Sequence, residues 1–256
     1  MSTPGARHTG IDAVRGAVMV IMALDHVREF FHADAMVFQA EDLARTTPLL
    51  FLTRWITHVC APGFVFLAGV VAQRRLARGG STAAVSRYLW TRGLWLVVLE
   101  LTVMRFAFNF RMSSQDPLFL IILVALGVSM VVLAGLVHLP APVVGGIGVA
   151  VIVFHNLLDP IRPSDLGGLA PLWNLLHDPG VFMVGGLPVL AGYPVLPWAG
   201  LMAVGFAAGR LYDLDPSRRT RLLSWTGVAL VAAFIVLRAI NRYGDPSVPG
   251  RRRRRR

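Results

Sequence analysis

The 256-residue sequence contains no lysine, only one cysteine and few charged side chains. Without lysine, a Schiff-base lysine and a Walker-type phosphate loop are both excluded. The single cysteine, Cys60, has no partner for an internal disulfide. Charged residues make up 15% of the chain, whereas a soluble domain has about 25%.

Hydrophobic side chains take the place of the missing charges. They make up 55% of the chain, and the mean hydropathy is +0.61, which indicates an integral membrane protein. The formal net charge is +11, but six of the positive charges are Arg251–Arg256. We therefore expect a lipid bilayer, and no nucleic acid, as a partner. Charges flank the apolar stretch Val18–Leu24 and no small-residue cleavage site follows it, so we expect a retained helix.

Apolar runs of about 20 residues, long enough to cross a bilayer as helices, recur along the chain. They predict an all-α fold, a polytopic transmembrane bundle of about seven spans, formed by a single domain over residues 7–246. The spans are expected at 11–31, 55–73, 89–108, 117–138, 141–158, 194–211 and 222–240. Glycines in the last part of the bundle predict close helix packing; they are Gly145, Gly146, Gly148, Gly200, Gly205 and Gly209.

Arginine placement predicts the orientation of the bundle. The arginine-rich segments 74–92 and 210–221 fall on one side if seven spans alternate, and positive loops stay in the cytoplasm. We therefore expect a multi-pass protein of the cell inner membrane with a cytoplasmic N-terminus. This orientation places five of the seven histidines at the outer surface, namely His26, His32, His58, His155 and His177.

Polar residues follow one face of the first span at steps of three and four residues. Asp12 and Arg15, near the inner end, either pair with each other or contact a charged cytoplasmic donor. His26, near the outer end, can accept and return a proton near neutral pH and is the main catalytic candidate. Asp25 lies about 100° around the helix from His26, so it either assists His26 or pairs with Arg28 in a purely structural network.

Three further polar positions are candidates for function or for packing. His58 comes four residues before Pro62, where it either caps the second span or joins His26 at the outer surface. Glu100 lies within the third span, where a carboxylate must be paired or protonated, and we expect an ion pair with an arginine of another helix. We assign Arg105, His155 and Asn156 to the same polar network, and we predict no metal site.

Several motifs occur in a characteristic order. They are IDAVRG, MALDHVREFF, TRWITHVCAPGFVFLAG, LWLVVLELTVMRF, HNLLD, YPVLPWAGLMAVGFAAGRLYD and LRAINRYGDP. Together they resemble the bacterial branch of the heparan-alpha-glucosaminide N-acetyltransferase catalytic-domain family, part of a wider group of membrane acyltransferases. The resemblance covers most of residues 7–246. It implies transfer of an acetyl or other acyl group from cytoplasmic acetyl-CoA to an amine or hydroxyl, often of a sugar, on the far side.

The resemblance also bears on individual residues. His26 falls where the lysosomal enzyme has a functionally important asparagine, and His32 or His58 is expected to replace that enzyme's essential histidine. We expect Arg15 and Asp12 to contact the CoA donor, and His26 or His58, with Asp25, to act as the general base. Relatives continue with a further membrane segment, so we expect residues 247–256 to be a disordered tail from a truncation or an added tag, unless a span was missed.

Two other classes of function remain open at this stage. A proton-coupled transporter would use Glu100, Asp25 and His26 as a relay. A non-catalytic membrane scaffold would use the same polar groups only to hold helices together.

Overall fold

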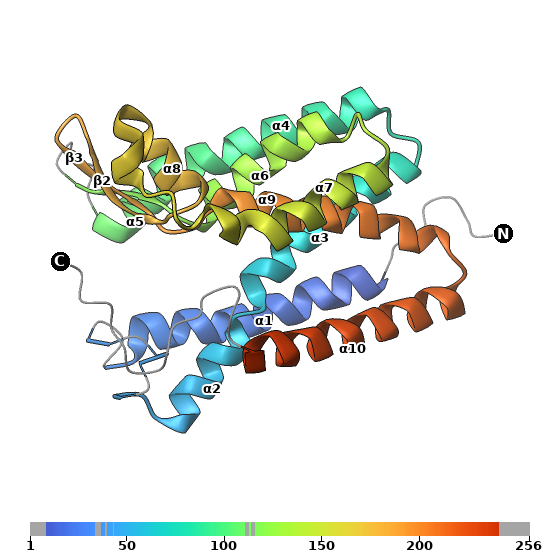
Figure 1. The fold of residues 1–256 in the computed structure, drawn as a ribbon, viewed down its shortest axis with the longest axis horizontal. Helices are drawn as coiled ribbons and strands as arrows, with labels where there is room; N and C mark the ends of the chain where they lie inside the picture. The colour runs from blue at the N-terminus through green and yellow to red at the C-terminus, as the bar shows by residue number, and fades with distance from the viewer. Residues whose placement is uncertain are drawn as a thin grey trace.

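The computed structural model describes residues 9–33, 37–38, 40–42, 44–110, 113 and 116–240. The predicted arginine-rich tail, 247–256, lies outside the described residues. The described part is mostly helical, as the sequence predicted. Figure 1 shows the long helices running in roughly the same direction, with α8 and three short strands grouped at one end.

The helices and strands have the following bounds. The α-helices are α1 (Thr9–Phe31), α2 (Pro48–Thr57), α3 (Cys60–Ala77), α4 (Thr82–Leu99), α5 (Arg105–Asn109), α6 (Ile122–Leu136), α7 (Ala141–Phe154), α8 (Ala170–Leu176), α9 (Val195–Ala208) and α10 (Pro216–Ile240). A π-helix, η1 (Glu100–Met104), joins α4 to α5. The 3-10 helices are η2 (His155–Leu158), η3 (Pro163–Leu169) and η4 (Gly209–Asp213). The strands are β1 (Leu118–Leu120), β2 (Gly180–Val184) and β3 (Leu187–Ala191).

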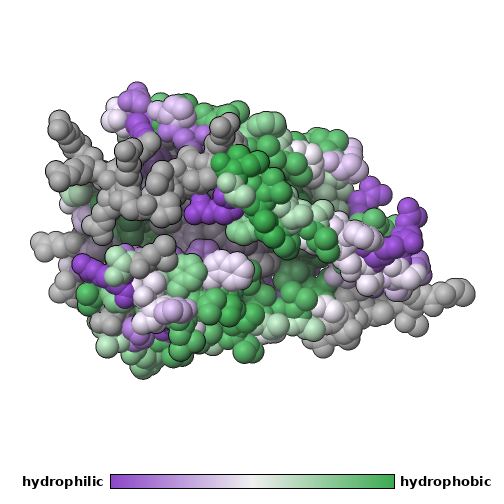
Figure 2. All heavy atoms as spheres, turned by 60° about the horizontal axis from the view of Figure 1, so that its bottom comes forward, coloured by the Kyte–Doolittle hydropathy of each residue, from purple (hydrophilic) through white to green (hydrophobic). Residues whose placement is uncertain are grey.

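Four helical segments of the described chain are long and apolar enough to cross a membrane: Pro48–Ala77, Ala141–Leu158, Val195–Asp213 and Pro216–Ile240. The expected seven spans are therefore not confirmed, although the membrane character is. The first expected span, α1, is less apolar because it carries charged side chains at Asp12, Arg15, Asp25, Arg28 and Glu29. Figure 2 shows hydrophobic side chains over much of the visible face, with hydrophilic side chains toward both ends.

A break divides the segment that was expected to be the second span. Helix α2 ends at Thr57 and α3 begins at Cys60. Pro62 explains the position of the break, because proline has no N–H to donate to the carbonyl four residues earlier, that of His58. The α2 helix starts with its own cap, since the Thr47 side chain accepts a hydrogen bond from the Leu50 N–H at 3.2 Å.

The core of the bundle lies among α3, α4, α6, α7 and α9. Its fully buried members include Val65, Leu89, Leu133, Val144, Met202 and Phe206. Facing glycines allow these helices to approach closely, as small residues do in membrane proteins. A Cβ built on Gly93 of α4 would lie 2.5 Å from the Gly127 carbonyl oxygen of α6. A Cβ on Gly148 of α7 would lie 2.5 Å from the Gly200 carbonyl oxygen of α9.

Glycine packing was predicted for the last helices, and most of those glycines are in contact. Gly205 of α9 faces the backbone of Phe66 in α3, and Gly209 faces the Gln73 side chain. Gly146 is the exception, since a Cβ there would meet nothing within 4 Å. By contrast, no described residue of α10 is buried.

A small sheet at one end of the bundle departs from the all-α expectation. Strand β3 lies in the centre, parallel to β1 and antiparallel to β2. Gly185 and Gly186 join β2 to β3, and both have positive φ, at 56° and 82°. Two consecutive residues with positive φ form the tight turn that matches the twist of a hairpin, and glycine adopts it without strain.

Candidate functional site

The end of the molecule opposite the strands carries the arginine-rich connection between α3 and α4 (Figure 1). We call this the arginine end and the other the strand end.

A cavity of about 570 Å³ opens at the arginine end between α1 and α3. Its lining residues are Ile11, Asp12, Arg15, Val71, Arg74, Arg75, Arg78, Gly79 and Gly80. Basic residues in the last turn of a helix suit its negative dipole end, which explains why α3 ends in arginines.

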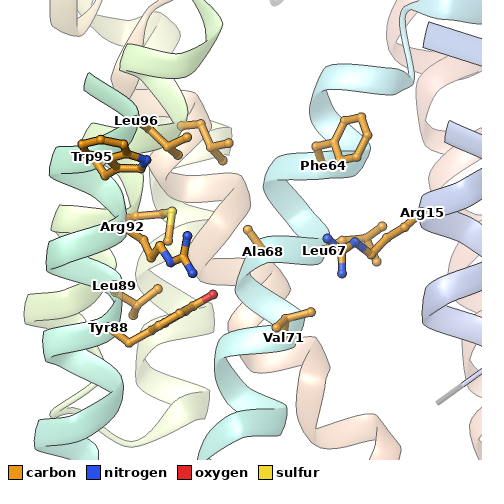
Figure 3. Close-up of a pocket in the computed structure, with 12 residues that line it drawn as sticks. Arg15, Phe64, Leu67, Ala68, Val71, Tyr88, Leu89, Arg92, Trp95 and Leu96 are labelled. Atoms are coloured by element: carbon orange, nitrogen blue, oxygen red, sulfur yellow. The ribbon is translucent and has the colours of Figure 1, made fainter. Parts of the chain in front are cut away.

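A second cavity, about 400 Å³ in volume, shares Arg15 and Val71 with the first. It runs between α3 and α4 toward the strand end, and Figure 3 shows its lining. The side chains of Arg15 and Arg92 point toward α3 from opposite sides. Further in, the lining is aromatic and aliphatic, with Phe64, Leu67, Ala68, Trp95, Leu96, Leu126 and Met130. We call the first, arginine-rich cavity the basic entrance and the second, mostly apolar cavity the apolar cleft; Arg15 and Val71 border both.

Contacts with aromatic rings and a carboxylate hold arginines of both cavities in place. The Arg75 guanidinium lies 4.2 Å from the centre of the Tyr88 ring, and that of Arg92 lies 5.8 Å from the same centre. Such cation–π contacts stabilise a guanidinium without neutralising it. Arg74 instead forms an ion pair with Asp213. Positive charge at Arg75 and Arg92 therefore stays available to a polyanion.

The polar cluster predicted on α1 is organised around Asp25. Its carboxylate accepts a hydrogen bond from Thr57 at 2.6 Å and another from Arg28. Arg54 lies 3.5 Å away and donates from its Nε to Glu41 at 2.6 Å. The structure therefore pairs Asp25 with Arg28 and α2, and Asp25 makes no described contact with His26.

The two histidines predicted as catalytic lie apart from this cluster. His26 is 53% exposed, and its nearest charged partner is Glu29, at 3.9 Å. His58 follows the last residue of α2, is exposed, and its Nδ1 lies 3.1 Å from the Arg54 carbonyl oxygen. No described contact joins the two histidines. His32 lines another cavity, of about 370 Å³, together with Arg28.

Glu100 does not form the ion pair with an arginine of another helix that the sequence led us to expect. No arginine pairs with it in the described chain. Its Oε2 accepts a hydrogen bond of 2.9 Å from the backbone N–H of Leu123, in the first turn of α6. A carboxylate suits that position because the exposed N–H groups of a helix N-terminus attract negative charge. Arg105 binds backbone carbonyl oxygens instead, at Ser113 and Asp116, both at 2.8 Å.

The polar groups at the end of α7 form a cluster of their own. His177 Nε2 lies 3.1 Å from Asp159 Oδ1, and the His177 side chain is only 4% exposed. The His155 and His177 rings pack edge to face, with centres 6.0 Å apart. Asn156 donates to Asp159 at 3.4 Å. Sequence reasoning placed His155 and Asn156 in a network but missed the Asp159–His177 pair, although Asp159 ends the HNLLD motif.

The relay that a proton-coupled transporter would need is not formed in the described chain. Asp25 bonds to Thr57 and arginines, Glu100 to Leu123, and His26 only approaches Glu29. No hydrogen bond connects the three. Nor does any described group of three or more His, Cys, Asp or Glu residues have the geometry to hold a metal ion.

Comparison with protein families agrees with this architecture. The model of the family described as heparan-alpha-glucosaminide N-acetyltransferase, catalytic, matches residues 7–241. The chain belongs to this family. No curated protein and no solved structure matches the chain. The match includes both arginine-lined cavities and the Asp25 cluster, and family membership indicates a membrane acetyltransferase.

Proposed function

We propose that the protein takes an acetyl group from acetyl-CoA and passes it through the membrane to an amine or hydroxyl of a sugar-like acceptor. The observation that carries this proposal is the pair of cavities that share Arg15 and Val71. One cavity is rich in arginine and opens at the end of the bundle. The other is apolar and continues between α3 and α4. A CoA thioester has the same order of parts, with phosphates at one end and a reactive acyl group at the other.

The chemistry of the lining fits such a donor. Guanidinium groups bind phosphate oxygens with charge-assisted, often bidentate hydrogen bonds. Arg15, Arg75 and Arg78 would hold the phosphates, and Asp12 lies at the same entrance. The CoA arm would then enter the cleft beside Phe64, Ala68 and Trp95. An apolar surrounding keeps water away from the thioester and so limits hydrolysis.

This assignment also sets the orientation in the membrane. CoA is a cytoplasmic metabolite, so the arginine end and the N-terminus would face the cytoplasm of a cell whose plasma membrane holds the protein. The acceptor would bind at the strand end, near His26, His32 and His58. Either His26 or His58 remains a candidate general base there, whereas Asp25, held by Thr57 and Arg28, would act by positioning.

The proposal is tested with purified protein in lipid nanodiscs and radiolabelled acetyl-CoA. We expect saturable CoA binding and transfer of label to at least one member of a panel of amino sugars and polyols. Arg75→Gln should raise the Kd for CoA about tenfold, because a hydrogen bond to a charged group contributes about 1.5–3 kcal/mol. Arg162→Gln, at the strand end, is the matched control and should bind CoA like wild type. Absence of both CoA binding and labelled product would overturn the proposal.

A further inference from the structure

Glu100 is a buried carboxyl group whose bonding is incomplete. The residue is 2% exposed. Its Oε2 accepts the Leu123 N–H at 2.9 Å, but its Oε1 is also buried and has no hydrogen-bond partner. A buried polar atom without a partner costs on the order of 1–3 kcal/mol, and more for a charged group. A carboxyl group is therefore present inside the bundle although its burial destabilises the fold.

The backbone at Glu100 is unusual as well. Glu100 is the first residue of η1, the π-helix between α4 and α5. π-helical turns are rare and are found frequently at functional sites. The Glu100 N–H still donates to the Leu96 carbonyl oxygen, whereas the Glu100 carbonyl oxygen accepts from the Arg105 N–H, five residues later, so the helix widens directly after Glu100. Helix capping alone needs only one acceptor oxygen, and a neutral serine, threonine or asparagine supplies it at lower cost.

Glu100 comes after the cleft residue Leu96 along the chain, in the direction that leads away from the arginine end. Figure 3 shows the cleft face of α4 carrying Tyr88, Arg92 and Leu96 in succession, away from the arginine end. Glu100 follows Leu96 by four residues, which is one turn on the same helix face. On α6, the cleft residue Leu126 lies three residues after Leu123, the Glu100 partner. Continued by one turn from the cleft, α4 reaches Glu100 itself and α6 reaches Leu123, the residue that donates to Glu100.

The Tyr193 phenol is influenced by charged groups of the Asp25 cluster and by Glu100. Burial raises the pKa of the Tyr193 phenol, the charge of Arg54 lowers it, and the Asp25, Glu29 and Glu100 carboxylates raise it again. The phenol is therefore close enough to be affected by charges from both sites. Its ring packs edge to face on Trp198, with centres 5.4 Å apart.

We infer that Glu100, in place of His26 or His58, is the proton acceptor for acyl transfer, positioned where the thioester would end. This inference rests on the proposed function. The acceptor nitrogen or oxygen attacks the thioester carbonyl carbon, a C–N or C–O bond forms, and the C–S bond breaks. The proton of the acceptor passes to the unpartnered Oε1 of Glu100. Glu100 then returns it to the departing CoA thiolate, so the enzyme ends in its starting state.

Glu100→Gln is the decisive substitution. A glutamine oxygen can still accept the Leu123 N–H, so the first turn of α6 keeps its cap, but the amide cannot take up a proton. We expect kcat to fall at least 100-fold, within the range of general base catalysis. The KM for acetyl-CoA, the Kd for CoA and the melting temperature should stay close to wild type. Thr102→Val, in the same π-helix, is the control and should keep wild-type kcat.

The possible outcomes separate this inference from the proposed function. Wild-type kcat in Glu100→Gln, with an active wild type, overturns the role of Glu100 and leaves the proposed function standing. Loss of CoA binding and melting temperature together with kcat also overturns it, because Glu100 would then be structural. A wild-type protein that neither binds CoA nor transfers label overturns both. Only a selective loss of kcat supports the inference.

Discussion

Thr57 on α2 donates a hydrogen bond of 2.6 Å to Asp25 on α1, and the Thr57 residue is only 3% exposed. The bond joins two segments that are 32 residues apart in the chain. Arg28 donates to both groups, at 3.4 Å to the Thr57 hydroxyl. A buried hydroxyl, a carboxylate and a guanidinium therefore satisfy one another where α1 meets α2.

Asp25→Asn should destabilise the protein by about 1–3 kcal/mol, because Arg28 and Arg54 lose their shared carboxylate in a half-buried place. The measurement is the melting temperature in detergent. His26→Gln changes the next residue, which is 53% exposed, and should alter stability by no more than about 0.5 kcal/mol. Equal melting temperatures for the two variants would show that the cluster does not hold α1 to α2.

Gly205→Ala should weaken the packing of α9 on α3. A Cβ at Gly205 would lie 2.9 Å from the backbone carbonyl carbon of Phe66, and backbone cannot move aside as a side-chain tip can. Such overpacking costs about 1–3 kcal/mol, seen as a lower melting temperature. Gly146→Ala is the control, since its Cβ would meet nothing within 4 Å. A loss at Gly146 equal to that at Gly205 would contradict close glycine packing as the cause.

Features that depend on local spacing could be predicted from the sequence. Asp25 and Arg28 are three residues apart on a helix, so their pairing follows from helical geometry. Gly200 and Gly205 lie in a small-residue stretch whose packing role is general in membrane helices. Arg15 was expected near the inner end of the first helix, and it lines both cavities there, while its assignment to the donor stays a prediction.

Features that depend on how helices cross could not be predicted. Glu100 reaches Leu123, 23 residues away, only because α4 and α6 pack through Gly93 and Gly127. An arginine partner was expected because its positive charge would neutralise the carboxylate. The carboxylate instead accepts a hydrogen bond from the N-terminal turn of α6. The β2–β3 hairpin was missed because its strands are five residues long and lie in a connection that hydropathy treats as one loop.

Ala68→Leu should narrow the apolar cleft and weaken donor binding. Ala68 lies on α3 in the middle of the cleft, facing α4 (Figure 3). A steric cost of about 1–3 kcal/mol corresponds to a rise of roughly 5- to 150-fold in the KM for acetyl-CoA. Ala84→Leu, on an exposed part of α4, should leave that KM unchanged. An unchanged KM in Ala68→Leu would place the donor elsewhere.

Glu41 should make stability depend on pH in the acid range. Burial tends to raise the pKa of its carboxyl group, but the hydrogen bond and charge of Arg54 outweigh burial and hold the pKa below its ordinary value of 4.5. A lowered pKa in the folded state means that the stabilisation is complete above pH 4.5 and is lost as the pH falls below it. Melting temperatures measured from pH 7 to pH 3.5 should therefore fall more steeply for wild type than for Glu41→Gln. Parallel curves would show that the Glu41–Arg54 pair contributes nothing.

The Asp159–His177 pair should hold the connection between α7 and the sheet. His177 immediately follows α8 and is nearly fully buried, while its Nε2 reaches Asp159 at 3.1 Å. Asp159→Asn keeps the size of the side chain but removes the charge, so α8 and β2 should open more often. Hydrogen exchange of residues 170–184 should accelerate severalfold, because amide protection reports local opening.

The neighbouring Asp178 provides the control for that experiment. Its ion pair with Arg162 is long, at 3.9 Å, and both side chains are exposed. Exposed pairs of this kind contribute about 0–1 kcal/mol. Asp178→Asn should therefore exchange like wild type over the same residues. If instead Asp178→Asn and Asp159→Asn accelerate exchange equally, the contact between Asp159 and the buried His177 is not what holds α8 in place. Negative charge in this region would then have a general effect on its stability.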